Sequence, residues 1–399
     1  MLENWKKNVT VFMTSQMISL LGSSLVQYAI TWYIMLETKS GLYSAIAMVC
    51  GFLPIFILSP IAGVWADRYS RKTLIMVADG GIAVTTLLLA ILFLIGYREI
   101  WILFVALVIR GIGSAIQSPC VNAVLPDIVP EEQLSRINGM NSSIQAIANL
   151  VCPMASGALL SVASMEAIFF IDVITAALAI IIMMKYLYLP KAQKPSEEVG
   201  TWSSFKEGVQ YAFSKKYLKV LFVCMISLWI VAGPMMSLPA LQVVRVFGDK
   251  LWYLTAVETA SGVGMIAGAL LISVWKGFKS SIVTMAAALV VMGGAVVMMG
   301  FPTYFMLYLV MAVVMCGMLS IFNTLAITFL QKKIDKEYIG RVFGMTTMFS
   351  SSLMPLGMLV FGPLADIIAI EYILIACGIV VILVAGSIGM STTLKRAEA

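Results

Sequence analysis

Two carboxylates and one guanidinium lie inside long apolar stretches of the chain, where an isolated charge is expensive. The acids are Asp172 and Glu258, and the base is Arg110. An apolar medium disfavours the charged form of a carboxylate, so a protein that alternately exposes such a group can load and release a proton. We therefore predict Asp172 and Glu258 as proton-coupling residues. For Asp172, a purely structural contact with a neighbouring polar group stays open as an alternative.

A second group with possible chemistry lies between two apolar stretches and consists of Gly63, Asp67, Arg68, Arg71 and Lys72. It combines a glycine suited to close packing, an acid at a helix end and a basic cluster. An aspartate that faces a helix N-terminus or an arginine can form a contact that opens and closes. We predict a gating latch here; an ordinary basic loop is the alternative, but it does not explain Gly63 and Asp67 at this spacing.

Polar side chains within the apolar stretches either bind a ligand or hold helices together, and the sequence does not separate these roles. The candidates for a cavity lining are Gln27, Tyr28, Gln117, Gln145, Asn149, Gln242 and Asn323. Asp79 lies near the start of another stretch, and we expect it to be structural, paired with Arg71 or Lys72.

Composition defines the elements that must position these groups. Of the 399 residues, 61% are apolar and 12% are charged, and the mean hydropathy is +0.99, whereas soluble domains carry roughly 25% charged residues. An all-α, polytopic membrane protein of about twelve helices is therefore predicted. Without histidine or CxxC spacing among the six cysteines, neither a metal nor a cofactor is expected.

Apolar runs bounded by charges or turn residues predict the position of each span. The predicted spans are 9–36, 42–65, 73–96, 100–121, 139–164, 167–189, 218–244, 251–275, 281–301, 303–330, 342–365 and 371–391.

The basic residues orient this layout. Of 26 Lys and Arg residues, 21 fall in loops on the side of the N-terminus and four in loops on the other side, with Arg110 inside a span. Cytoplasmic loops collect positive charge, so both termini are predicted to be cytoplasmic. The net charge of +6 therefore reflects topology, and no nucleic-acid partner is expected.

Two halves of the sequence align at a shift of 205 residues, which pairs Gly63 with Gly268, Arg136 with Arg341, Gly139 with Gly344 and Gly157 with Gly362. Such a duplication is typical of parallel repeats; chance similarity of glycine-rich apolar segments is the alternative. We predict six-helix bundles at 1–190 and 218–399, joined by a cytoplasmic linker at 191–217 that carries an amphipathic helix. Ile272 stands where Asp67 would align, so the latch is predicted in the first half alone.

Proline and glycine inside two spans permit a kink and close helix packing. These predicted kink residues are Pro153, Gly157, Gly362 and Pro363. A bent helix without further role is the alternative.

The loop at Gly63–Lys72 resembles the Gly-x-x-x-Asp-Arg-x-x-Arg-Lys signature of the major facilitator superfamily. Arg110-Gly111-Ile112-Gly113 resembles a compressed form of the superfamily's fourth-helix Arg-x-x-x-Gly pattern, and Cys152–Gly157 resembles a degraded antiporter signature. The resemblance implies that Arg110 assists proton transfer or binds a substrate or a carboxylate. A structural ion pair is equally compatible with the residue.

Two further segments, Pro119–Leu134 and Lys336–Phe343, are similar to the macrolide-efflux branch of bacterial drug exporters, and the similarity extends over essentially the whole chain. It implies a proton-driven exporter of lipophilic drugs in a bacterial cytoplasmic membrane, with Asp172 and Arg110 at matched positions.

We therefore expect a secondary active transporter that acts as a monomer on a small amphipathic substrate, with protons and the lipid bilayer as its other partners. A carrier of a metabolite or siderophore is the first alternative, and an integral-membrane enzyme or signalling protein is the second. An enzyme is not expected, because the chain has no histidine cluster, no paired catalytic acids at one level and no room for a soluble domain.

Overall fold

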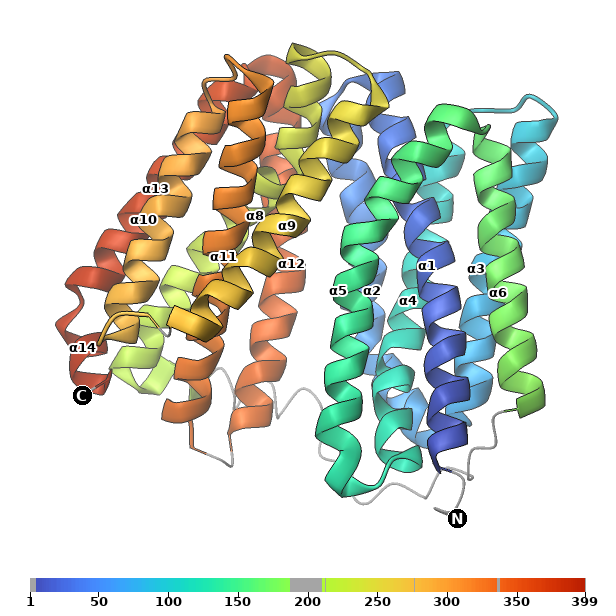
Figure 1. The fold of residues 1–399 in the computed structure, drawn as a ribbon, viewed down its shortest axis with the longest axis horizontal. Helices are drawn as coiled ribbons and strands as arrows, with labels where there is room; N and C mark the ends of the chain where they lie inside the picture. Colours follow the sequence, from blue (N-terminus) through green and yellow to red (C-terminus); the bar gives the residue numbers. More distant parts are fainter. Residues whose placement is uncertain (1–4, 187–209, 212, 276, 336–337, 399) are drawn as a thin grey trace. The chain divides into compact units, whose positions relative to one another are not determined.

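Long helices joined by short turns make up the protein in the computed structural model, which describes residues 5–186, 210–211, 213–275, 277–335 and 338–398 (Figure 1). In the first half the helices are α1 (Trp5–Thr38), α2 (Gly41–Arg68), α3 (Arg71–Leu94), α4 (Ile100–Ile128), α5 (Glu131–Val162) and α6 (Met165–Tyr186). In the second half they are α8 (Lys216–Val246), α9 (Leu251–Trp275), α10 (Ser281–Met299), α11 (Phe305–Lys333), α12 (Ile339–Ile367), α13 (Ile370–Met390) and α14 (Thr392–Glu398). These described residues contain no β-strand, so the all-α class is confirmed.

Within the described ranges, twelve helices are long and apolar enough to cross a membrane, as predicted. Several extend beyond the apolar stretch that predicted them. The helix α4 continues to Ile128, where the N–H of Val129 still donates to the carbonyl of Leu125, and Pro130 then follows without an N–H to donate. Backbone hydrogen bonding carries a helix past the apolar layer until a residue stops it, so hydropathy underestimates helix length.

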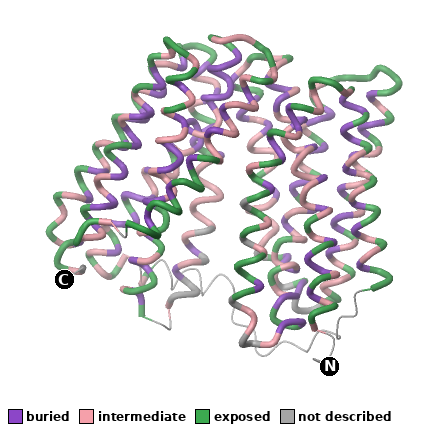
Figure 2. Tube along the Cα trace, viewed as in Figure 1, coloured by how far each residue is buried: buried purple, intermediate pink, exposed green. Residues whose placement is uncertain are grey.

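Buried and exposed positions alternate along each helix (Figure 2). Many exposed side chains are large and apolar, such as Leu88, Ile174 and Val360. In water this surface would be unfavourable, but a hydrocarbon solvent tolerates it and demands only that backbone polar groups be satisfied within each helix. The surface therefore fits a lipid-exposed bundle.

The described helices divide between two compact units. The first unit contains residues 1–37 and 46–198, and the second contains 38–45 and 199–399. Residues 187–209 lie outside the described part, so the predicted linker at 191–217, its amphipathic helix and the domain boundaries stay predictions. Residues 38–45, which comprise the end of α1, the turn and the start of α2, group with the second unit. Asp366 at the end of α12 accepts hydrogen bonds there from the backbone N–H of Gly41 and of Leu42.

Both units repeat one packing arrangement. In the first unit α3 packs against α4 and α6, and in the second α10 packs against α11 and α13. The helices that occupy equivalent places in the two halves of the sequence therefore pair in the same way. This is the arrangement that a duplicated six-helix unit predicts.

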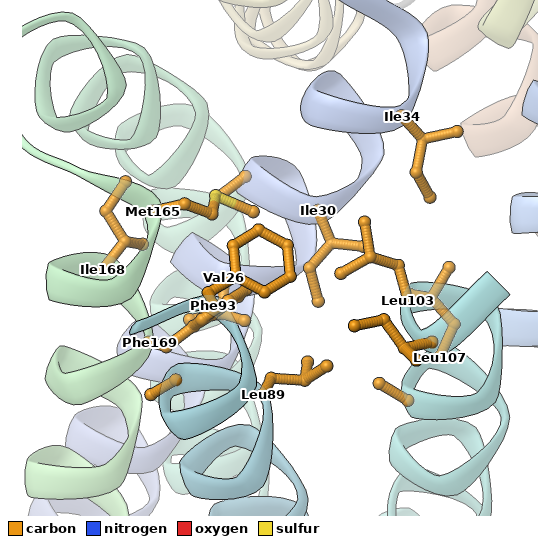
Figure 3. Close-up of a cluster of buried hydrophobic side chains, with 14 of the residues drawn as sticks. Val26, Ile30, Ile34, Leu89, Phe93, Leu103, Leu107, Met165, Ile168 and Phe169 are labelled. Atoms are coloured by element: carbon orange, nitrogen blue, oxygen red, sulfur yellow. The ribbon is translucent and has the colours of Figure 1, made fainter. Parts of the chain in front are cut away.

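The core of the first unit lies between α1, α3, α4 and α6 (Figure 3). The rings of Phe93 and Phe169 meet edge to face, with centroids 5.3 Å apart, and Tyr33 meets Phe93 in the same way at 5.7 Å. Such aromatic pairs favour one relative position of their helices. The core thereby holds in place the four helices that carry the buried polar groups described below.

Glycines lie where helices of the second unit are in backbone contact, and these positions leave no space for a side chain. A Cβ on Gly268 of α9 would lie 2.1 Å from the carbonyl oxygen of Gly317 on α11, and a Cβ on Gly264 would lie 2.3 Å from that of Val313. Close backbone approach through small residues is a main source of helix association in lipid. By contrast, a Cβ on Gly63 would meet no described atom within 4 Å, so the close packing expected for Gly63 is not seen.

The predicted kink residues lie inside helices. Pro153 and Gly157 are both buried in α5, and Pro363 lies inside α12. A Cβ on Gly362 would lie 2.6 Å from the carbonyl oxygen of Gly41, so Gly362 serves close packing.

Candidate functional site

Arg110 and Asp172, two of the predicted proton-coupling residues, form a buried ion pair in the first unit. One guanidinium nitrogen of Arg110 lies 2.6 Å from Oδ2 of Asp172, and the two residues are 4% and 0% exposed. The same nitrogen donates to Oγ1 of Thr86 at 2.7 Å, and another donates to the carbonyl of Ser23 at 2.8 Å. The structural ion pair that the sequence left open is therefore present.

Hydrogen bonds from three helices hold the Asp172 carboxylate. Ser23 of α1 donates to Oδ1 at 3.0 Å, and Thr86 of α3 donates to Oδ2 at 2.9 Å, in addition to Arg110 of α4. Removing one partner from such a buried pair leaves an uncompensated charge, which costs about 3–5 kcal/mol. The pair therefore constrains α1, α3, α4 and α6 together.

Local sequence explains how these side chains meet. A Cβ on Gly111 would lie 2.7 Å from the carbonyl of Gly51 on α2, and a Cβ on Gly113 would lie 2.6 Å from the side chain of Ile82 on α3. The glycines after Arg110 therefore let α4 approach both neighbours. On α1, a Cβ on Gly22 would meet Oγ1 of Thr175 at 1.9 Å, so this glycine brings α1 and Ser23 against α6.

A second buried polar group surrounds Asp79, which is 2% exposed. Its Oδ1 accepts hydrogen bonds from Ser19 at 2.9 Å and from Nε2 of Gln117 at 2.7 Å. The expected pairing of Asp79 with Arg71 or Lys72 is wrong. Asp79 lies eight residues, about 12 Å of helix, beyond Arg71, and this distance places it inside the apolar core.

Arg71 and Lys72 bind elsewhere. Arg71 pairs with Asp127 at the end of α4, and it also donates to the carbonyls of Ala66 at 3.0 Å and Ala123 at 2.8 Å. Lys72 donates to the carbonyl of Met184 at 3.2 Å. Arg71 thus connects the adjacent ends of α2, α3 and α4.

The structure does not test the whole predicted latch. The side chains of Asp67 and Arg68 lie outside the described residues, so the latch itself stays a prediction. Sequence reasoning missed Asp127 as the partner of Arg71. An acid at the end of the next antiparallel helix was the available signal.

A cavity of about 490 Å³ lies within the first unit between α1, α2, α4 and α5. Five of the predicted lining residues border it, namely Gln27, Tyr28, Gln117, Gln145 and Asn149, and Gln16 joins them. Apolar side chains such as Met17, Phe52 and Ile55 complete the wall. Such a mixed lining suits a ligand with apolar bulk and a few polar groups.

Both buried acids lie behind this wall. Neither Asp79 nor Asp172 borders the cavity, but their hydrogen-bond donors Ser19, Ser23 and Arg110 do. Ser19 and Ser23 are four residues apart and share one face of α1, which is the sequence signal that could have identified them. The wall of the cavity is therefore hydrogen-bonded directly to two carboxyl groups.

The candidates in the second unit are separated from one another. Gln242 is fully buried, accepts from the hydroxyl of Tyr308 at 2.9 Å and donates to Glu371 at 3.4 Å, so it holds helices together. Asn323 borders a small pocket of about 40 Å³. Glu258 is half-buried on α9 and makes no hydrogen bond or ion pair within the described part of the chain.

The sequence matches the family model of the Major Facilitator Superfamily over residues 12–358, and the chain belongs to this superfamily of membrane transporters. It is 29% identical to Macrolide efflux protein A of Streptococcus pyogenes over 386 residues, covering 96% of this chain and 95% of that protein. It is 30% identical to Macrolide efflux protein A of Enterococcus faecalis over 77% of this chain and 96% of that protein. Among solved structures, a bacterial homologue of the iron transporter ferroportin in an inward-facing state has a TM-score of 0.69 at 14% identity, covering 96% of this chain and 98% of that one.

The protein is therefore a multi-pass membrane transporter and not an enzyme, as the sequence predicted. The resemblance to the macrolide-efflux branch is confirmed by these relatives.

Proposed function

We propose that this transporter exports lipophilic, amphipathic drugs of the macrolide kind from the bacterial cytoplasm in exchange for protons. The observation that carries the proposal is the cavity of about 490 Å³, whose mixed amide and apolar lining is hydrogen-bonded to buried carboxyl groups. The names of two relatives, which match 96% and 77% of this chain, support the same substrate class.

In the proposed cycle, substrate enters from the cytoplasm or the inner leaflet, the two six-helix bundles rock in alternating access, and a proton from outside resets the transporter. The proton-coupling candidates are Glu258, Asp172 and Arg110. A lipophilic cation or weak base competes with the proton for a carboxylate. Both termini lie in the cytoplasm, and the transporter works as a monomer in the cytoplasmic membrane.

Transport of a macrolide into inside-out vesicles, energised by a pH gradient, tests this proposal. We expect uptake that stops when a protonophore collapses the gradient. Unchanged uptake without the gradient would exclude proton coupling, and absence of uptake would exclude macrolides as substrates.

A siderophore carrier is the second candidate, because half of the chain is 24% identical to the Staphyloferrin A transporter of Staphylococcus aureus. A deletion strain and an overexpressing strain separate the two possibilities. Drug export changes the inhibitory concentration of macrolides, whereas siderophore transport changes growth under iron limitation and leaves drug susceptibility unaltered.

A further inference from the structure

Asp79 is a buried acid that the proposed cycle does not use. It is 2% exposed, no lysine or arginine pairs with it in the described residues, and its Oδ2 has no hydrogen-bond partner. A carboxylate in this position would be an isolated charge in an apolar bundle. The neutral acid is far more favourable there, since burial without a counter-charge is among the largest penalties a side chain can meet.

The interior of the first unit holds more carboxyl groups than cationic groups, so its charges balance only if one carboxyl is protonated. Between their polar ends, the six helices α1 to α6 contain only three residues from Asp, Glu, Lys and Arg: Asp79 on α3, Arg110 on α4 and Asp172 on α6. The helices α4 and α6 both pack against α3, and they contribute Arg110 and Asp172. The helix α1 has no such residue between Lys7 and Glu37. One guanidinium balances one carboxylate, so the second carboxyl needs a proton to be neutral.

Two buried atoms without a hydrogen-bond partner lie on neighbouring helices of this unit. In the described part of the chain, the buried side-chain nitrogen and oxygen atoms without a partner are Oδ2 of Asp79 and Nε of Arg110. One is an acceptor on α3 and the other a donor on α4, and these helices pack directly against each other. Buried polar atoms are almost always satisfied, and a neutral Asp79 carboxyl lowers the cost of leaving Oδ2 without a partner.

The two acids form adjacent layers along the bundle. Ser19 and Ser23 are one turn apart on α1, and Gln117 and Arg110 are two turns apart on α4. In each layer, therefore, α1 and α4 both supply hydrogen-bond donors to the carboxyl group. Ser19 and Gln117 also border the cavity, so the Asp79 carboxyl is one hydrogen bond away from the cavity wall.

We propose that Asp79 is a proton-binding residue of this transporter, protonated while Arg110 pairs with Asp172, and that its proton exchanges with the cavity past Ser19 and Gln117. On release, the O–H bond of the carboxyl breaks and the proton passes to water in the cavity. Because Arg110 already balances Asp172, the negative charge left on Asp79 is balanced by a cationic substrate group, which competes with the proton for this carboxyl as in the proposed cycle. The proton-binding site stands on the structure, and its role as the coupling site rests on the proposed function.

Infrared spectroscopy of the lipid-reconstituted, full-length protein tests the site without any substrate. We expect the wild type at neutral pH to have the C=O stretch of a protonated carboxylic acid that Asp79→Asn lacks. The matched control is Glu99→Gln, an exposed acid at the start of α4 whose side chain makes no capping hydrogen bond, and it should retain the band. An unchanged band in a folded Asp79→Asn protein would overturn the proposal.

A second variant covers the possibility that Asp79→Asn does not fold. Ser19→Ala removes one of the two donors to Oδ1 and keeps the acid, so the same band should move to higher wavenumber. A band at an unchanged position would also overturn the proposal, because its carboxyl would then lie elsewhere in the protein.

The coupling role is tested by macrolide-dependent proton flux in liposomes, read with an entrapped pH dye. We expect the wild type and Glu99→Gln to move protons when a macrolide is added. The proton flux of Asp79→Asn should be at least tenfold lower than that of the wild type. Equal flux in Asp79→Asn refutes the coupling role. If the infrared band is present and the wild type shows no macrolide-dependent flux, the proposed function fails while the proton-binding site stands.

Discussion

Breaking the ion pair between Arg110 and Asp172 should destabilise the protein strongly, whereas replacing both partners should not. Either Asp172→Leu or Arg110→Met leaves one buried charge without its partner, at a cost of about 3–5 kcal/mol. The double variant Arg110→Met/Asp172→Leu removes both charges and fills the space with apolar atoms, which is often neutral or stabilising. The double variant should therefore be more stable than either single one.

The structure supports the upper end of this range. Both side chains are at most 5% exposed, so solvent does not screen the pair. Loss of Asp172 also removes the acceptor of the Ser23 hydroxyl, whereas the Thr86 hydroxyl still has the carbonyl of Ile82 within 3.0 Å. For domains of 150–250 residues, each kcal/mol lowers the melting temperature by about 2–4 °C, which gives a decrease of about 6–20 °C for each single variant.

Thermal unfolding in detergent, followed with a thiol-reactive dye, measures this directly because five of the six free cysteines are buried until the protein unfolds. Glu99→Gln serves as the control for a charge change at an exposed site. Single variants that melt within about 2 °C of the wild type would refute the reasoning, since this corresponds to about 1 kcal/mol or less. A double variant that melts below both single variants would refute it as well.

Other contacts support further tests. Gly268→Ala would place a Cβ 2.1 Å from a backbone oxygen of α11 and should cost about 1–3 kcal/mol, whereas Gly294→Ala, whose Cβ would meet no described atom within 4 Å, should melt like the wild type. Asp366→Asn weakens the hydrogen bonds to the first amides of α2, and those amides should exchange hydrogen about 10–100-fold faster, since a bond to a charged group contributes about 1.5–3 kcal/mol; Asp249→Asn, which alters only an exposed pair, should leave the exchange unchanged. Arg71→Gln removes the contact between α2, α3 and α4, and under the proposed function it should slow macrolide transport severalfold at equal expression; transport at the wild-type rate would exclude a gating role for this residue.

Membership of the macrolide-efflux branch and the all-α class followed from local patterns. Each span needs about 20 apolar residues whatever its neighbours do, so hydropathy alone located all twelve. The loop at Gly63–Lys72 and the similar segments elsewhere carried the family resemblance. The exact helix ends were less accessible, as the extension of α4 to Ile128 illustrates, because hydrogen bonding and proline positions set them.

The candidate site was predicted in part. Five of seven cavity candidates border the cavity, but Gln242 is buried between helices and bonded to Tyr308. An amide side chain inside an apolar span looks the same in the sequence whether it borders a cavity or is buried between helices. Only the rotation of α8 against its neighbours separates a group that faces a cavity from one that holds helices together.

By itself, the sequence determined how many helices cross the membrane, which family they belong to and which few ionisable residues the bilayer would have to tolerate. The tertiary structure decided how those residues combine. Arg110 and Asp172 are 62 residues apart in the chain and meet because Gly113 lets α4 approach α3 and Gly22 lets α1 approach α6. Asp79 was left with Ser19 and Gln117, and no lysine or arginine side chain among the described residues forms an ion pair with it. The energy of a buried charge depends on what surrounds it in three dimensions, and a linear sequence does not contain that information in readable form.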